Sequence, residues 1–141
     1  MSRIGVVIAS HGDLARALIS SAEMIVGAQE GVATVCLDPV DNLETFHAAL
    51  CAAVDRIRTD AGVIVFIDLF GGTPANAAVL GLRERSYPVV SGVNLPMLLE
   101  VFVSRDGGLS AQELAEIALQ AGQSSIIDVS ARFAAQCQEE S

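Results

Sequence analysis

Short runs of apolar residues alternate along the chain with longer segments in which apolar residues recur every three or four positions. The short runs lie at residues 3–9, 32–37, 62–68 and 87–92. They are rich in valine and isoleucine and almost continuously apolar, which is typical of strands buried on both faces of a parallel sheet. The run at 62–68 is the richest in β-branched residues and is expected to be the central strand.

The segments between these runs show helical periodicity. In the first of them, Leu14, Leu18, Ala22 and Ile25 follow one another at spacings of four and three, which places them on one face of a helix. Further helices are expected over residues 41–57, 73–84, 94–103 and 110–122.

Polar residues mark where these later helices start. Asp41 and Ser110 are each followed three residues later by a glutamate, which is the pattern of a capping box. Thr73 is expected to be the N-cap of its helix, with Pro74 at the first helical position.

Strands that alternate with helices predict an α/β protein with a doubly wound, mostly parallel sheet and right-handed crossovers. We expect the flavodoxin-like strand order 2-1-3-4, in which the direction of winding reverses between the first and third strands. Residues 1–130 are expected to form one domain, followed by a C-terminal tail at 131–141. Within the domain, residues 124–129 predict a last short strand.

Composition and charge exclude several classes of function. The chain has 141 residues, too few for a barrel enzyme of about 250 residues. Its net charge of −9 argues against nucleic acid and anionic membranes as partners. No apolar run approaches the roughly 20 residues of a membrane span, and the start lacks the pattern of a signal peptide. Because Cys36, Cys51 and Cys137 are odd in number and widely spaced, we expect reduced thiols and a cytoplasmic location.

A reactive site is expected at the ends of the first and third strands, where the direction of winding reverses. His11 follows the first strand and Asp68 ends the third, so the predicted topology makes them neighbours although they are 57 residues apart. A carboxylate that accepts a hydrogen bond from one imidazole nitrogen fixes the tautomer and leaves the other nitrogen with a lone pair. We therefore predict that His11 is a nucleophile and that Asp68 orients it.

The turn Gly71-Gly72-Thr73-Pro74 supplies the second half of this site. Its glycines let the backbone approach an anion, and the helix that follows points N–H groups and the positive end of its dipole at the site. The Thr73 hydroxyl can donate to a phosphoryl oxygen. The helix after His11 is expected to offer a similar end. Together these features indicate transient attachment of a phosphoryl group, for which no metal or other cofactor is expected.

Other candidate residues favour structural roles. His47 lies among apolar positions of its helix, which favours a partly buried structural histidine. The cysteines have nothing nearby that would activate them. Met97, Leu98 and Leu99 form an apolar patch that either packs in the core or belongs to a subunit interface.

Three motifs resemble the mannose-family enzyme IIA component of the bacterial phosphoenolpyruvate-dependent sugar phosphotransferase system. The first is Gly5–Gly12, followed by Ser21–Met24; the others are Asp68–Pro74 and Gly92–Leu98. They occur in the family's order, and the resemblance covers roughly residues 3 to 130.

The resemblance implies that His11 accepts a phosphoryl group from the phosphocarrier HPr and passes it to a IIB component. It implies that Asp68 bonds the histidine ring and that Thr73, with Gly71 and Gly72, contacts the phosphoryl group. Gly12, Asn94 and Pro96 match the flanking loops. The membrane components IIC and IID would be reached only indirectly, through IIB.

The resemblance also implies a homodimer whose last strand is antiparallel to the others and is exchanged between subunits. Residues 124–129 match that strand, and Met97 and Leu98 are candidates for the apolar interface. No linker or IIB domain follows residue 130, so a standalone IIA component is expected. Ala75 stands where members often carry Phe, which could change the rim where partners dock.

Four other functions compete with this one. A histidine phosphatase normally carries Arg before its catalytic His, but Ser10 stands there. A flavin carrier is disfavoured because the chain has no Trp and one Tyr. The phosphoryl-donor subunit of a dihydroxyacetone kinase has a related domain without the motif at residues 68–74. A regulatory IIA component, whose phosphorylation state another protein senses, shares the same chemistry.

Overall fold

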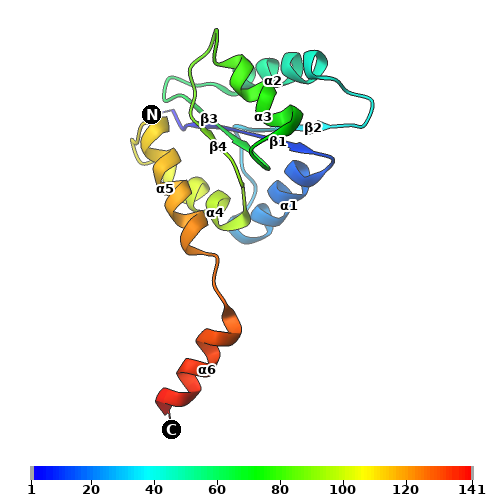
Figure 1. The fold of residues 1–141 in the computed structure, drawn as a ribbon. Coiled ribbons are helices and arrows are strands. Elements are labelled where there is room, and N and C mark those ends of the chain that lie inside the picture. The colour runs from blue at the N-terminus through cyan, green and yellow to red at the C-terminus, as the bar shows by residue number, and fades with distance from the viewer. Residues whose placement is uncertain (1, 141) are drawn as a thin grey trace.

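The computed structural model describes residues 2–140 as an α/β domain with a C-terminal helix that extends away from it (Figure 1). The strands are β1 (Gly5–His11), β2 (Val32–Leu37), β3 (Val63–Ile67) and β4 (Val89–Val90). The helices are α1 (Leu14–Val26), α2 (Leu43–Ile57), α3 (Gly72–Gly81), α4 (Leu95–Ser104), α5 (Ala111–Ser124) and α6 (Val129–Glu140). Among the described residues, none of the helices combines the length and hydropathy that crossing a membrane requires.

The sheet has the predicted order β2-β1-β3-β4, and all of its pairs are parallel. Figure 1 shows α2 and α3 on one face and α1, α4 and α5 on the other. Side chains alternate across each strand, so Val6 and Ile8 of β1 pack toward α1, α4 and α5, while Val7 and Ala9 pack toward α2 and α3. This double burial explains the continuously apolar strand sequences.

Helix boundaries differ from the sequence-based expectation at several turns. Helix α2 is capped by Asn42 and Thr45, one residue later than the predicted start at Asp41, because this pair closes the capping box. Helix α5 runs past Gly122 to Ser124, so this glycine does not end the helix. It lies where α5 packs against α4: a Cβ there would lie 2.5 Å from the Met97 Cε atom.

The prediction of a last strand is wrong for the single chain, and for Met97 and Leu98 the structure decides between the two alternatives. Residues 124–129 do not form a strand: α5 includes Ser124, residues 126–128 have no regular structure, and α6 starts at Val129. A strand requires a neighbouring edge, and within residues 2–140 this segment pairs with none. Met97 and Leu98 are 3% and 0% exposed in the core of their own chain, which confirms the core alternative and rules them out as interface residues.

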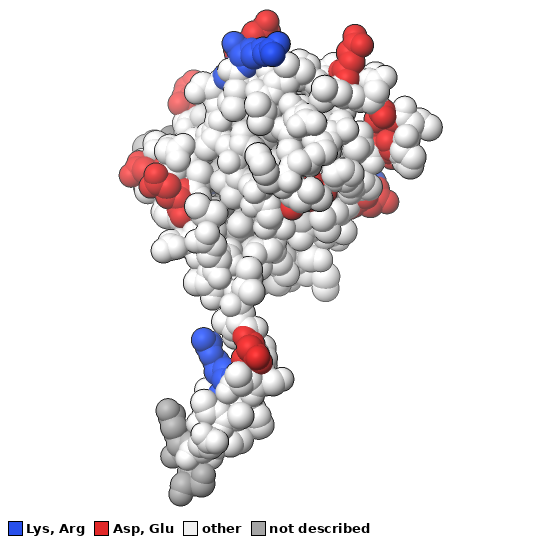
Figure 2. Space-filling view, viewed as in Figure 1, with Lys and Arg blue, Asp and Glu red and all other residues white. Residues whose placement is uncertain are grey.

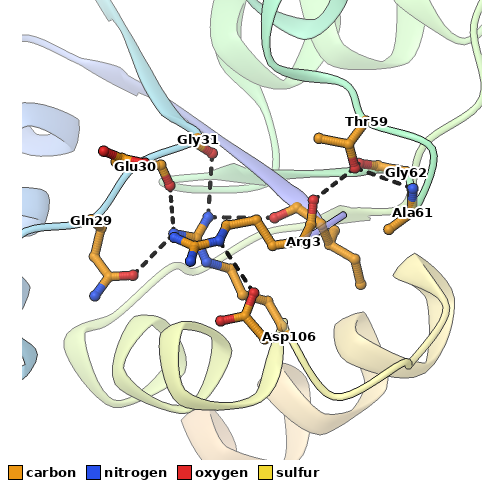
Figure 3. A network of polar contacts seen from close by, with 10 residues as sticks. Arg3, Gln29, Glu30, Gly31, Thr59, Ala61, Gly62 and Asp106 are labelled. Atoms are coloured by element: carbon orange, nitrogen blue, oxygen red, sulfur yellow. Dashed lines mark hydrogen bonds and ion pairs between the residues drawn. The ribbon is translucent and has the colours of Figure 1, made fainter. Parts of the chain in front are cut away.

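A buried arginine ties together the amino-terminal edge of the sheet. Arg105, which is 1% exposed, donates to the backbone carbonyls of Ile4, Glu30 and Gly31 and to the side chain of Gln29. Figure 3 shows this network beside the ion pair of Arg3 with Asp106 and the bonds of Thr59. It connects three segments far apart in sequence at the edge opposite to His11.

Candidate functional site

His11 and Asp68 meet at the carboxyl edge of the sheet, as predicted. Strands β1 and β3 are direct neighbours, with Ala9 opposite Ile67, so the residues that follow these positions lie side by side. The His11 Nδ1 atom lies 2.8 Å from Asp68 Oδ2, and the His11 backbone N–H donates to the same oxygen at 2.9 Å. The other carboxylate oxygen, Oδ1, accepts the Leu69 N–H at 2.9 Å.

These hydrogen bonds keep Asp68 ionised. Its side chain is 7% exposed, and burial alone would raise its pKa; the bonds from the His11 backbone, the His11 ring and the Leu69 N–H outweigh burial and lower the pKa below 3.8. An ionised carboxylate accepts a hydrogen bond from the Nδ1–H group, so the free lone pair of a neutral ring lies on Nε2. The ring is 47% exposed, which leaves Nε2 accessible from solvent.

Nε2 lies against the start of α3. A Cβ atom built on Gly72 would lie 3.2 Å from both Nε2 and Cε1 of His11, closer than ordinary van der Waals contact. Gly72 also has φ of +82°, a backbone conformation that favours glycine. The second glycine of the turn is therefore required for two separate reasons, conformation and proximity to the ring.

The amino-terminal end of α3 has no side-chain cap. The helix begins at Gly72 after the N-cap Gly71, so the prediction that Thr73 is the N-cap is wrong. Gly71 adopts φ of +115°, and the helix starts at Gly72, two residues earlier than an N-cap at Thr73 followed by Pro74 would place it. The N–H groups of Gly72 and Thr73 belong to the first turn, which has no intrahelical acceptors.

Helix α1 also starts close after His11, and its N-cap Asp13 makes no side-chain cap bond, but one of its first N–H groups is already occupied. Ser10, fully buried at the end of β1, accepts the Ala15 N–H through its hydroxyl oxygen at 2.8 Å. Near its start, Arg16 pairs with Asp13 at 2.7 Å. Ser10 is a site residue that the sequence reasoning missed; its only signal was its position between a buried strand and a helix start.

Gly12, Asn94 and Pro96 shape the surrounding loops. Gly12 adopts φ of +54° and donates its N–H to the Leu37 carbonyl. Asn94 caps α4 by accepting the Met97 N–H, and it donates to the Gly122 carbonyl of α5; Pro96 lies in the first turn of α4. The contacts of Asn94 thus join the start of α4 to α5.

His47, the other histidine, contacts a cysteine of its own helix. The His47 Nε2 atom is 3.3 Å from the Sγ atom of Cys51, one helical turn along α2, and burial raises the pKa of that thiol. Ala75 is 3% exposed and lines the base of a hollow of about 520 Å³ beside Phe70, which is 84% exposed. Within residues 2–140, no three His, Cys, Asp or Glu side chains converge in a way that could hold a metal ion.

This geometry fits one kind of chemistry. An accessible imidazole nitrogen with a lone pair faces an uncapped helix end, and a fixed carboxylate stands behind the ring. The nitrogen can attack an electrophile, the helix end favours anionic oxygens beside it, and the carboxylate stabilises positive charge on the ring.

Comparisons with known proteins identify similar chains. Residues 5–119 match the protein family described as "PTS system fructose IIA component". The chain is 36% identical over 124 residues to the PTS system mannose-specific EIIAB component of Escherichia coli K12, covering 87% of this chain and 38% of that protein. It is 36% identical over 104 residues to the PTS system fructose-specific EIIA component of Bacillus subtilis, covering 73% of this chain and 71% of that one.

Solved structures agree with these sequence matches. A phosphotransferase system component EIIA from Streptococcus agalactiae superimposes with a TM-score of 0.82 at 29% identity, covering 91% of this chain and 98% of that one. A mannose/sorbose-specific IIA subunit from Enterococcus faecalis gives 0.80 at 32% identity, with coverages of 90% and 95%.

Proposed function

The chain belongs to the EIIA family of the phosphoenolpyruvate-dependent sugar phosphotransferase system, in its mannose, fructose and sorbose branch, and we propose that it is a phosphoryl carrier acting through His11. In this proposal, Nε2 of His11 accepts the phosphoryl group from phosphorylated HPr and passes it to a IIB component. The observation that supports it best is the position of Nε2, between an Asp68-oriented ring and the uncapped start of α3.

The first transfer forms one bond and breaks one bond. The Nε2 lone pair attacks the phosphorus atom of the donor phosphohistidine, the N–P bond of the donor breaks, and its electron pair returns to the donor imidazole. His11 keeps the proton on Nδ1, so the phosphorylated ring carries a positive charge, which the Asp68 carboxylate stabilises at 2.8 Å. Transfer to IIB is the same step with His11 as the donor.

The oxygens of the phosphoryl group require hydrogen-bond donors that do not hold it too tightly. In the proposal, the first-turn N–H groups of Gly72 and Thr73 and the Thr73 hydroxyl supply them. The loop at 68–74 contains no arginine, so no guanidinium clamp opposes release of the group to the next carrier.

The proposal also covers partners and location. HPr and a IIB component are direct partners, the membrane components IIC and IID are reached through IIB, and the chain acts in the cytoplasm as a homodimer. The net charge of −9 suits partners that present basic surfaces. The sugar is chosen by other components and is not part of the proposal.

The proposal is tested by labelling. Incubation with phosphoenolpyruvate, enzyme I and HPr is expected to place one acid-labile phosphoryl group on the protein. His11→Ala is expected to abolish labelling, whereas the control His47→Ala, which removes the other histidine, is expected to leave it intact. Labelling that persists in His11→Ala would overturn the assignment.

A further inference from the structure

A hollow between helices α2 and α3 begins beside the proposed phosphoryl site. It has a volume of about 520 Å³, and we call it the α2–α3 hollow. Pockets that bind small molecules typically measure about 300–1000 Å³. Because Gly71 lines the hollow and is also the N-cap of α3, the hollow adjoins the helix end that faces His11. The residues that line it are Leu43, Phe70, Gly71, Ala75, Asn76, Val79, Leu80 and Arg83.

Most of this lining is apolar and open to solvent. The buried side chain of Ala75 ends at Cβ, which leaves the space above it free. Phe70 and Val79, on either side of Ala75 in sequence, are 84% and 57% exposed, and Leu43 of α2 is exposed as well. An apolar molecule in the hollow would remove these side chains from water, which favours binding.

Arg83 is the one charged residue in the lining of the α2–α3 hollow. The ion pairs among the described residues do not include it, whereas its neighbour Arg85 is held by Asp55 at 2.8 Å. Figure 2 shows basic side chains at the top of the molecule, over the region of α2 and α3, although the chain as a whole has a net charge of −9. A guanidinium beside an apolar surface suits a ligand with an apolar body and one anionic group.

A smaller and more polar hollow indicates where the anionic group would lie. It has a volume of about 210 Å³ and shares Leu80 and Arg83 with the α2–α3 hollow. Its other lining residues are His47, Gly81, Glu84 and Arg85. The Glu84 carboxylate lies 4.0 Å from Arg85, so this end carries a negative charge of its own. It therefore suits a single negative charge, as on a carboxylate, better than a dianion such as a phosphate monoester.

We propose that the α2–α3 hollow binds a small organic monocarboxylate whose body is an acyl chain or an aromatic ring. The body lies over Ala75 between Phe70 and Val79, and the carboxylate pairs with Arg83. A ligand there covers the surface next to Gly71, which a protein must approach to reach His11. Bound ligand therefore competes with phosphorylated HPr; this consequence rests on the proposed function, whereas the binding does not.

Binding is tested on the isotopically labelled full chain by NMR, with octanoate as the probe. Saturable shifts are expected for the amide signals of Asn76 and Val79, with half-saturation at about 1–10 mM for a ligand of this size. Octanamide has the same body without the charge and is expected to bind at least about tenfold more weakly. Octyl phosphate, a dianion, is also expected to bind more weakly than octanoate.

Two variants separate the body of the ligand from its charge. Ala75→Phe fills the hollow and is expected to abolish octanoate binding, and its folding is checked by circular dichroism. Arg83→Gln, at an exposed position, is expected to weaken octanoate about tenfold and to leave octanamide unchanged. Arg56→Gln is the matched control, since Arg56 is an exposed arginine of α2 that lines neither hollow, and octanoate binding is expected to persist.

Rapid quench with phosphorylated HPr tests the competition. Saturating octanoate is expected to raise KM for phosphorylated HPr and to leave kcat unchanged, and the rise is expected to be smaller in Arg83→Gln. Binding that leaves KM unchanged would overturn the competition.

Three results would overturn the binding site: no saturable shift up to about 20 mM octanoate, equal affinities for octanoate and octanamide, or an unchanged octanoate affinity in Arg83→Gln. If octanoate does not bind and Ala75→Phe raises KM for phosphorylated HPr, the hollow receives a side chain of the partner protein instead. Octanoate binding without phosphoryl labelling of His11 would contradict the proposed function alone.

Discussion

Replacing Asp68 by asparagine tests the oriented-ring mechanism, because the change keeps the size of the side chain and removes its charge. The carboxylate accepts three hydrogen bonds: two from His11 on Oδ2 and one from Leu69 on Oδ1. An asparagine has one accepting oxygen. In one orientation the asparagine oxygen faces His11, and its NH₂ group then faces the Leu69 N–H, donor against donor. In the other orientation the NH₂ group faces the backbone N–H of His11, donor against donor, and favours the ring tautomer that carries its proton on Nε2.

Either orientation removes at least one hydrogen bond to a charged acceptor, which is worth about 1.5–3 kcal/mol. If this loss falls on the transition state, it corresponds to about a 10- to 160-fold slower phosphoryl transfer, at roughly 1.4 kcal/mol per factor of ten. The rate of transfer from phosphorylated HPr, followed by rapid quench, measures the effect. Asp55→Asn, which removes a carboxylate paired with Arg85 on the surface, is the matched control and is expected to leave the rate unchanged.

The same variant has a distinct pH signature. Because the pKa of Asp68 is lowered in the folded protein, its contribution to stability is complete above the ordinary value of 3.8 and is lost as the pH falls through the folded-state pKa. Urea unfolding is therefore expected to separate wild type and Asp68→Asn at pH 7 and to bring them together below pH 3.8. An unchanged transfer rate, or a stability difference independent of pH, would refute the role given to Asp68.

Three further substitutions address other parts of the molecule. Gly72→Ala is expected to lower the free energy of unfolding by about 1–2 kcal/mol and to slow phosphoryl transfer by crowding His11. Gly108 has the same φ of +82° but lies in open space, so Gly108→Ala is expected to lose stability alone. Urea unfolding measures the stability of both variants, and rapid quench measures their transfer rates. Ser10→Ala is expected to cost about 0.5–2 kcal/mol in the same unfolding measurement, because it removes a buried helix cap; an unchanged unfolding midpoint would contradict that role. Arg105→Met is expected to cost at least about 2 kcal/mol by leaving buried carbonyls without a donor, while labelling by phosphorylated HPr proceeds; loss of labelling in a folded variant would contradict the separation of this network from the site.

The sheet and the central pair of the site could be predicted because they follow from strong, simple patterns. The continuously apolar sequence of β1 requires a strand that is buried on both faces. In the order β2-β1-β3-β4, the ends of β1 and β3 are neighbours, which brings His11 to Asp68 whatever the conformation of the loops. Structural details that depend on backbone angles were harder to predict from the sequence. Thr73 is a good N-cap by residue type, but α3 begins two residues earlier than that predicts, after Gly71 with φ of +115°.

Long-range contacts limited the remaining predictions. Ser10 looks like any small residue after a strand, and only the position of Ala15 shows that it caps α1. Arg105 counts as an ordinary surface charge until the carbonyls of Ile4 and Glu30 surround it. The isoleucines at 126 and 127 suit an exchanged strand as well as an irregular connection, and the sequence pattern alone cannot distinguish these when the partner surface belongs to another molecule.

The 47% exposure of the His11 ring has a kinetic consequence for the proposed carrier. The opening through which a partner reaches Nε2 admits water by the same route, so spontaneous hydrolysis competes with every productive encounter. The fraction of phosphoryl groups that reach the next protein then depends on how often partners collide with the loaded protein during the lifetime of its N–P bond. Dilution of the partners would therefore be expected to waste phosphoenolpyruvate as well as to slow the flux.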